Sequence, residues 1–149
     1  MTTAGTGEGC IFCDHLASGD DGVAHILYRG EGVFVILNAF PYNTGHVMVA
    51  PLRHAAGLRD LSEDERAELF DVATRATGVI QDAVSPEGFN IGLNIGAAAG
   101  AGVPDHLHVH VVPRWAGDTN FMTTVGDSKV LPELLDKTDA KLRPGFQRL

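Results

Sequence analysis

Hydrophobic and polar residues alternate strictly in two segments of the chain. In residues 89–96 the odd positions are apolar and the even positions are asparagine or glycine, whereas in residues 106–111 histidine alternates with leucine and valine. A period of two predicts a β-strand with one buried and one polar face, so strands are expected at Phe89–Gly96 and His106–Val112. Shorter apolar runs predict strands at His25–Arg29, Val33–Leu37 and His46–Ala50.

The clearest helix lies between Ser62 and Ser85. Ser62 and Glu65 have the spacing of a capping box, in which each side chain accepts a hydrogen bond from the backbone of the other residue. Apolar residues follow at intervals of three and four, which predicts one buried stripe. Shorter helices are expected at residues 10–18 and 130–142. Since strands and helices do not alternate along the chain, the pattern predicts an α+β fold with an antiparallel sheet.

Composition limits the kind of protein that the chain can be. It has 149 residues, with 19 acidic against 11 basic side chains and a formal net charge of −8. This length predicts a single domain, which we expect at residues 10–149 after a flexible lead-in at 1–9. The acidic balance argues against a nucleic-acid partner, because such binding needs Lys and Arg on the phosphates. No apolar run is long enough for a membrane span and the first residues lack a secretion signal, so a cytoplasmic location without a membrane partner is expected.

Three histidines, His106, His108 and His110, share the polar face of one predicted strand. Side chains two apart on a strand are separated by about 7 Å, so the row is about 13 Å long. It adjoins a glycine-rich loop at 96–105. Such a row is the solvated face of an edge strand, a metal site built on two of the histidines, or a catalytic site. In the catalytic interpretation a neutral imidazole at His108 attacks phosphorus, and backbone N–H groups stabilise the phosphate oxygens.

The triad and several flanking segments resemble the histidine triad (HIT) superfamily of nucleotide hydrolases and transferases. His106–Val112 matches the family signature, in which three histidines alternate with apolar residues and two apolar residues end the motif. Other segments that resemble family elements, in the same order, are Cys10-Ile-Phe-Cys13, Leu37-Asn38, Gly45–Pro51 with His54, Gly92-Leu-Asn94 and Pro113-Arg114. The resemblance covers residues 10–124. It implies a HIT-like antiparallel sheet of about five strands, with one long helix and one or two shorter ones, and a homodimer joined edge to edge.

The resemblance also implies roles for individual residues. The middle histidine of the family motif is the nucleophile, which implies that His108 carries a nucleotidylated intermediate, with His110 contacting the phosphate and His106 completing the triad. Asn38 would hold the ribose hydroxyls, and Asn94 would lie beside the α-phosphate. The apolar residues that would enclose the purine are Ile11, Phe12, Leu37 and Phe40.

Cys10 and Cys13 have the Cys-x-x-Cys spacing of a redox pair or of a metal site. A redox pair is expected between a strand and a helix, but only a glycine-rich segment precedes this one. In the zinc-bearing branch of the family, two cysteines, a histidine after the third strand and the first triad histidine bind a structural zinc. That set transfers to Cys10, Cys13, His54 and His106, and a closed Cys2His2 tetrahedron is the favoured interpretation. No organic cofactor is expected, and His46 is expected to be structural or to support a site residue.

The chain departs from the family pattern in a way that bears on the substrate. The loop between Asn94 and His106 lacks the serine or threonine often found there, so phosphate contacts would come from backbone N–H groups, with Gly102 as the first candidate. The segment after the triad is similar to the branch that includes diadenosine tetraphosphate phosphorylases. This similarity implies that Trp115 and Asn120 contact the second half of a dinucleotide.

The sequence therefore predicts a nucleotide hydrolase or nucleotidyltransferase that cleaves dinucleoside polyphosphates through a nucleotidyl-histidine on His108. The acceptor is water or inorganic phosphate, and the triad does not decide between them. The alternatives are a nucleoside 5′-phosphoramidate hydrolase with the same nucleophile and a non-catalytic nucleotide-binding or scaffold protein. The intact triad argues against the non-catalytic alternative, because a binding protein needs no nucleophile.

Overall fold

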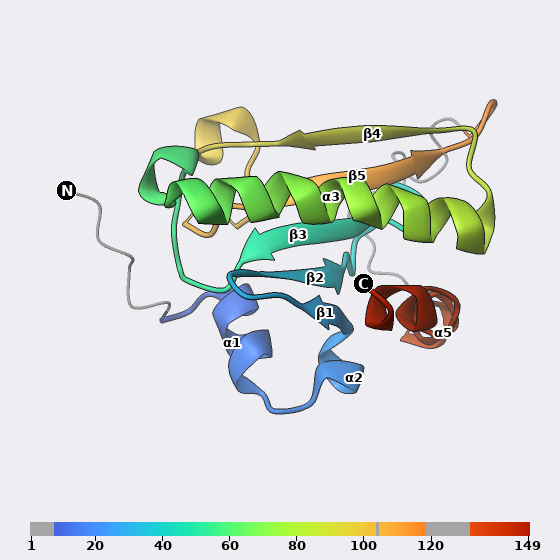
Figure 1. The fold of residues 1–149 in the computed structure, drawn as a ribbon, viewed down its shortest axis with the longest axis horizontal. Coiled ribbons are helices and arrows are strands. Elements are labelled where there is room, and N and C mark those ends of the chain that lie inside the picture. Colours follow the sequence, from blue (N-terminus) through green and yellow to red (C-terminus); the bar gives the residue numbers. More distant parts are fainter. Residues whose placement is uncertain (1–7, 104, 119–131) are drawn as a thin grey trace.

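A five-stranded antiparallel sheet organises the described part of the chain, with the strand order β1-β2-β3-β5-β4 (Figure 1). The structure is a computed structural model that describes residues 8–103, 105–118 and 132–149. The strands are β1 (Ile26–Arg29), β2 (Val33–Leu37), β3 (Val47–Pro51), β4 (Gly88–Leu93) and β5 (Val109–Arg114). The predicted α+β class and the five-stranded sheet are confirmed.

Helices surround this sheet. Within the described ranges they are α1 (Ile11–Ala17), α2 (Asp21–Ala24), α3 (Glu63–Val84) and α5 (Pro132–Gln147), with 3-10 turns at Leu58–Asp60 and Ala97–Ala99. The predicted capping box begins α3: the Ser62 hydroxyl accepts from the Glu65 backbone N–H at 3.1 Å, and the Glu65 carboxylate accepts from the Ser62 N–H at 2.8 Å. The short helix α2 was not predicted. Asp20 caps it by accepting from the Val23 N–H at 3.1 Å.

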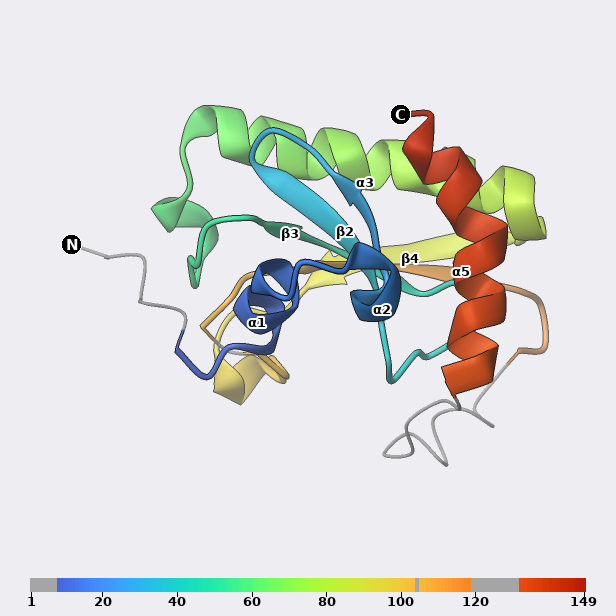
Figure 2. The same ribbon diagram turned by 90° about the horizontal axis from the view of Figure 1, so that it is seen from below.

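The two faces of the sheet are covered by different helices, with α3 on one side and α1 on the other (Figure 2). Because side chains alternate along each strand, Val35, Val49 and Val109 pack into one buried cluster with Leu69 and Ile80 of α3. Residues of the opposite phase pack with the N-terminal segment, and these are Phe34, Ile36, Met48 and Ala50 against Cys10 and Phe12. The triad histidines belong to the second face, so they lie on the α1 side of the sheet.

The predicted strand at His106–Val112 begins later than expected. Pairing of β5 with β3 and β4 starts at Val109, so His106 and His108 precede the paired strand. The cause is the backbone before it, where the Leu107 N–H donates to the Ala55 carbonyl at 2.7 Å instead of joining the sheet ladder. The first two histidines are therefore held by a loop contact, and only His110 lies on a paired strand.

Other predicted boundaries also shift. β4 ends at Leu93 because the chain then turns at Gly96, whose φ is +85°. β1 starts after His25, which has a left-handed φ of +60° and ends α2. The C-terminal helix continues through Pro144 to Gln147, and the predicted start at residue 130 lies outside the described residues.

In the part of the chain that the structure describes, we find no helix with the length and apolar character needed to cross a bilayer. The cytoplasmic location stays a prediction. At the outer edge of the sheet, β5 is the one strand of the described residues that pairs with β4, and Ile91 and Ile95 beside this edge are 49% and 50% exposed. The sheet therefore ends in an unpaired strand next to exposed apolar side chains.

Candidate functional site

Within the described part of the chain, His108 has a hydrogen-bond partner at only one of its two ring nitrogens. Its Nδ1 lies 2.9 Å from the His106 carbonyl oxygen, and since a carbonyl only accepts, Nδ1 carries the hydrogen and Nε2 keeps its lone pair. Among the described residues, no group hydrogen-bonds to that Nε2. Burial lowers the pKa of His108 below its ordinary value, so the ring is neutral at pH 7. A neutral imidazole with a fixed tautomer and a free Nε2 is a nucleophile.

The ring of Phe12 supports the first two histidines. Its centroid lies 5.2 Å from those of both His106 and His108, in edge-to-face geometry, and the residue is only 2% exposed. Aromatic pairs favour this arrangement. The structure places Phe12 beneath the histidines, where it contacts their rings from the α1 side, and its expected contact with a purine stays a prediction.

His46 contacts the third histidine of the triad. The Tyr42 backbone N–H donates to His46 Nδ1 at 3.1 Å, so the His46 hydrogen is on Nε2. That nitrogen lies 2.9 Å from His110 Nδ1, which must accept, and the His110 hydrogen is therefore on Nε2. Burial, followed by the neighbouring histidines, lowers the pKa of His46 to about 3 and that of His110 to about 4. The chain of bonds thus fixes His110 as a neutral donor at Nε2, opposite in sense to His108.

Four side chains from distant parts of the sequence converge at the end of the sheet near α1. The ligand atoms of Cys10, Cys13, His54 and His106 all lie within 4.8 Å of one another. His106 Nδ1 is 3.4 Å from Cys10 Sγ, 3.6 Å from Cys13 Sγ and 3.2 Å from His54 Nδ1. Tetrahedral zinc, with bonds of about 2.3 Å to sulfur and about 2.0 Å to nitrogen, separates such atoms by about 3.3–3.8 Å. The donor set and its spacing therefore fit a four-coordinate metal ion.

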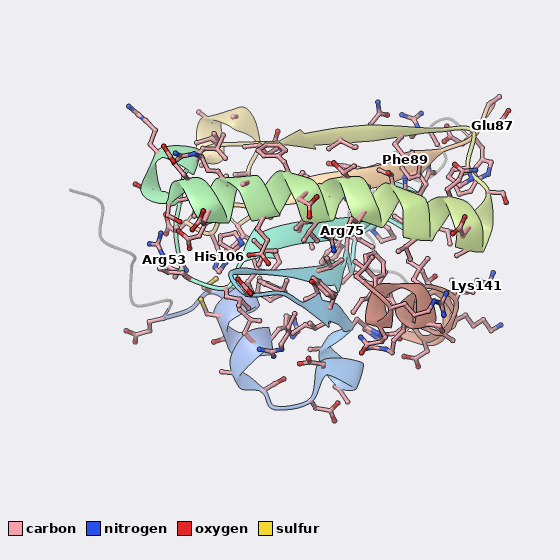
Figure 3. All side chains as sticks on the ribbon, in the orientation of Figure 1. Arg53, Arg75, Glu87, Phe89, His106 and Lys141 are labelled. Carbon is pink, nitrogen blue, oxygen red and sulfur yellow. The ribbon has the colours of Figure 1, made fainter. Side chains whose placement is uncertain are left out.

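The orientation of His106 supports the same interpretation. Its Nε2 donates to the Pro51 carbonyl at 2.8 Å, so the Nδ1 that faces the two sulfurs is an unprotonated lone pair. Metal-binding histidines are commonly oriented by a carbonyl in this way. In Figure 3 His106 lies beside α1, at the end of the sheet where the sulfur atoms of the N-terminal segment are drawn.

Without a cation the thiol at this cluster favours its neutral form. Burial, and then the hydrogen bond with Cys10, raise the pKa of the Cys13 thiol to about 11. Ligation by a metal removes the thiol proton, because the ligand is the thiolate. The fold thus brings the four predicted metal ligands together, and a bound cation would be required to hold Cys13 as a thiolate at neutral pH.

A cleft opens next to His110 on the same face of the sheet. It is a cavity of about 520 Å³ between β4, β5 and the loop at 42–43, and we call it the β4–β5 cleft. Among its lining side chains are His110, Asn90, Asn94, Tyr42 and Arg114. Asn94, expected beside an α-phosphate, therefore shares a cavity with the triad. Tyr42 was not predicted as a site residue, and Arg114 was noted only as part of a family element, although Arg114 has the same strand phase as the triad.

The other predicted substrate residues lie in varied surroundings. Asn38 uses its side-chain oxygen to accept from the Phe40 N–H at 2.8 Å. Leu37 is 5% exposed and belongs to the cluster packed under α3, on the face opposite the histidines. Ile11 and Phe40 are 51% and 49% exposed. Their expected contacts with a purine stay predictions, and Leu37 is the one whose position fits that role least.

Two more predicted contacts concern the loop before the triad and the segment after it. Gly102 lies in the loop before His106 and is exposed, with open space around it. Trp115 directs its indole N–H to the Ser85 carbonyl at 3.2 Å, and Asn120 lies outside the described residues. The structure thus does not bring Gly102 or Trp115 into contact with the triad.

The sequence of this chain is similar to those of known histidine triad proteins. A family model described as the HIT domain matches residues 22–117. An AP-4-A phosphorylase of Mycobacterium tuberculosis (strain CDC 1551 / Oshkosh) is 49% identical over 123 residues, which are 83% of this chain and 63% of the relative. The chain thus matches less than two thirds of that relative's length. A bis(5′-nucleosyl)-tetraphosphatase [asymmetrical] of Schizosaccharomyces pombe is 36% identical over 95 residues, 64% of this chain and 52% of the relative.

Solved structures share the fold. A hypothetical histidine triad nucleotide-binding protein from Sulfolobus tokodaii strain7 superposes with a TM-score of 0.79 at 29% identity, covering 94% of this chain and 93% of the other. A Zn-bound histidine triad family protein from Mycobacterium smegmatis has a TM-score of 0.77 at 28% identity, covering 95% of each chain.

Proposed function

Because the chain belongs to the HIT domain family, we propose that it cleaves dinucleoside polyphosphates through a covalent nucleotidyl intermediate on His108. The observation that carries the proposal is the fixed tautomer of His108, whose Nδ1–H is bound to the His106 carbonyl at 2.9 Å and whose Nε2 is free to attack. The substrate class comes from the relatives, since a protein 49% identical to this chain is named an AP-4-A phosphorylase.

The reaction has two steps. In the first, the Nε2 lone pair of His108 attacks the α-phosphorus, the bond from that phosphorus to the bridging oxygen breaks, and the leaving nucleotide keeps the electron pair. His110, which carries its hydrogen on Nε2, donates to a phosphate oxygen and offsets the developing charge. In the second step the acceptor oxygen bonds to phosphorus, the N–P bond breaks, and the electron pair returns to His108; when the acceptor is water, its proton passes to solvent.

The acceptor decides which products form. When His108 attacks the α-phosphorus of diadenosine tetraphosphate, ATP is the leaving group. The adenylyl group that stays on His108 then gives AMP if water accepts it and ADP if inorganic phosphate accepts it. A nucleoside phosphoramidate would use the same nucleophile but needs room for only one nucleotide. The β4–β5 cleft beside His110 favours the larger substrate, because its cavity of about 520 Å³ extends away from the triad.

The test is turnover of diadenosine tetraphosphate by the purified chain, with and without inorganic phosphate, with products separated by chromatography. ATP with ADP only when phosphate is present identifies a phosphorylase, and AMP with ATP in its absence identifies a hydrolase. His108→Ala is expected to abolish turnover, with His15→Ala on α1 as the control histidine. Full activity of His108→Ala would overturn the mechanism, and cleavage of a phosphoramidate alone would overturn the substrate class.

We further propose that Cys10, Cys13, His54 and His106 hold a structural zinc ion. The donor set is closed, with two sulfurs and two nitrogens within 4.8 Å of one another, and such a Cys2His2 set is typical of structural rather than catalytic zinc. The ion would link α1 to the loop before β5 and keep His106 out of the chemistry. Metal analysis of protein purified without added metal should give about one zinc per chain, and far less than one would remove the proposal.

A homodimer joined through β4 completes the proposed assembly. The support is the unpaired edge of β4 together with Ile91 and Ile95, which are 49% and 50% exposed. An exposed edge strand with apolar neighbours is suited to pairing with a second copy. Light scattering should give twice the chain mass, and Ile91→Glu should give a monomer. A monomeric wild-type chain at micromolar concentration would contradict this.

A further inference from the structure

We propose that Arg114 binds the polyphosphate of the leaving nucleotide and makes the chain prefer dinucleotides with a long phosphate bridge. The inference rests on the function proposed above and adds a specificity-determining residue to it. Arg114 is the only cationic side chain among the described residues that line the β4–β5 cleft. In a chain of net charge −8, a cation in the same cleft as His110 favours the binding of an anionic substrate there.

The floor of the cleft leads from the triad to this arginine. On β5, His110, Val112 and Arg114 alternate with inward-facing residues, so all three share the face of the triad. Across the ladder, Gly92 is paired with His110 and Gly88 with Arg114. Neither glycine has any atom within 4 Å of where a Cβ would be. The cleft therefore has open space beside Gly92, opposite His110, and Asn90 lies between this space and Arg114, to which its side chain is bonded.

Arg114 is held in place but keeps donors to spare. Its Nε and Nη2 donate to the Asp118 carboxylate at 2.9 and 3.0 Å, and its Nη1 donates to Asn90 Oδ1 at 2.6 Å. A guanidinium has five N–H donors, so one on each terminal nitrogen has no partner among the described residues. The side chain is 44% exposed. These two N–H groups can form the bidentate contact that phosphate oxygens prefer.

Asp118 acts as a fixed support rather than as a competing ligand. Its Oδ2 also accepts from the Asn43 amide at 2.6 Å and from the Trp115 backbone N–H at 2.9 Å. Arg114, followed by that backbone N–H, lowers the pKa of Asp118 well below its usual range, so it stays charged. The carboxylate orients the guanidinium before any ligand arrives, which reduces the entropy lost on binding.

Distance along the strand explains the selectivity. Arg114 is four residues beyond His110, about 13 Å along β5. The guanidinium is held at Asn90 and Asp118 rather than at His110, so we expect a chain of several phosphates that starts at the triad to reach it more readily than a single phosphate does. A substrate with a single phosphate, such as adenosine 5′-phosphoramidate, gains nothing from Arg114.

The test compares two substrates on one protein preparation. The ratio of kcat/KM for diadenosine tetraphosphate to that for adenosine 5′-phosphoramidate is measured for wild type, Arg114→Gln and Arg114→Lys. Loss of a bidentate charged contact should lower this ratio by about 10- to 100-fold in Arg114→Gln. Arg114→Lys keeps the positive charge but not the bidentate geometry of the guanidinium, so its kcat/KM ratio should lie between those of Arg114→Gln and wild type. A change in the folded fraction cancels, because both rates come from the same sample.

The matched control is Arg75→Gln on α3 (Figure 3). Arg75 also makes an ion pair with an aspartate four residues away in sequence, Asp71, at 2.9 Å, but it lies outside the cleft. The ratio of the two kcat/KM values in Arg75→Gln should equal that of wild type. If wild type cleaves the tetraphosphate and Arg114→Gln loses the same factor on both substrates, this inference is overturned and the proposed function stands. If wild type does not cleave the tetraphosphate at all, the proposed function fails and this inference with it.

Discussion

His46 and His110 are 64 positions apart in the sequence, yet His46 Nε2 lies 2.9 Å from His110 Nδ1. The Tyr42 N–H sets the tautomer of His46, and His46 in turn sets that of His110. The ring of Tyr42 stacks on that of His46, with a centroid distance of 5.2 Å and an interplanar angle of 18°, and this contact restricts rotation of the imidazole. A backbone N–H outside the triad therefore decides which nitrogen of His110 can donate to a substrate.

The first prediction concerns this relay. His46→Ala leaves His110 Nδ1 without its donor, so the ring can rotate or change tautomer, and kcat should fall by about 10- to 100-fold. His46→Gln places an amide donor near the same position and should recover part of the loss. Steady-state kinetics on diadenosine tetraphosphate give the comparison. A wild-type kcat in His46→Ala would show that His110 does not depend on this bond.

The second prediction is a loss of stability in mild acid. The folded-state pKa values of His46 and His110 are lowered to about 3 and about 4, whereas an unfolded histidine titrates near 6.5. Below about pH 6.5 the unfolded chain binds protons that the folded chain does not, so the free energy of unfolding falls as the pH drops toward the folded values. His46 alone should account for about 1–2 kcal/mol between pH 7 and pH 5.

Urea unfolding at the two pH values measures this slope in wild type and in His46→Gln. The variant keeps all four proposed zinc ligands, so acid release of a metal affects both proteins alike. Its stability should fall less between pH 7 and pH 5 than that of wild type. If the free energy of unfolding fell equally in wild type and His46→Gln between pH 7 and pH 5, His46 would take up its proton in the folded chain at the same pH as in the unfolded chain.

Periodicity was sufficient to predict the central part of the fold. Strict alternation predicted the two strands that carry the site, and a capping box with a regular apolar stripe predicted α3 to within one residue at its start. These signals are local, because strand faces and helix caps depend on residues close in sequence. The short helix α2 was missed because its four residues are too few to show an apolar period. The late start of β5 was missed because it depends on the contact of Leu107 with Ala55, which lies far away in sequence.

The candidate site shows the same division. Residue type and family resemblance led to Cys10, Cys13, His54 and His106, which the fold brings within 4.8 Å of one another. The role of Phe12 beneath the histidines was not foreseeable, because an apolar residue next to a cysteine gives no sign of what it packs against. Arg114 carried a signal, since it lies four residues after His110 on the same strand face, but its link to Asp118 and Asn90 required the folded chain.

The third prediction addresses the metal centre. Cys13→Ser removes one of two sulfur ligands, so zinc content should drop well below that of wild type, and the free energy of unfolding should fall by more than about 3 kcal/mol. His15→Ala, a histidine on the same helix but outside the cluster, should change neither quantity. Metal analysis with urea unfolding tests both. Wild-type zinc content in Cys13→Ser would exclude it as a ligand.

The fourth prediction concerns how α5 is attached. Asp139 is 8% exposed and accepts from Arg143 at 2.6 and 2.7 Å and from His25 at 2.8 Å. Arg143 also donates to the Ile26 carbonyl at 2.9 Å, so the network ties α5 to the start of β1. Removing one partner of such a pair leaves a partly buried charge uncompensated. Asp139→Ala should therefore lower the free energy of unfolding by about 2–4 kcal/mol.

Asp71→Ala is the control, because Asp71 and Arg75 have the same spacing and order on α3 but are 55% and 50% exposed. Solvent screens that pair, so its loss should cost less than about 0.5 kcal/mol. Urea unfolding of both variants at pH 7 separates the effect of burial from that of the ion pair itself. Were Asp139→Ala to unfold at the same urea concentration as Asp71→Ala, the attachment of α5 would come from its apolar face alone, where Leu142 and Phe146 are fully buried.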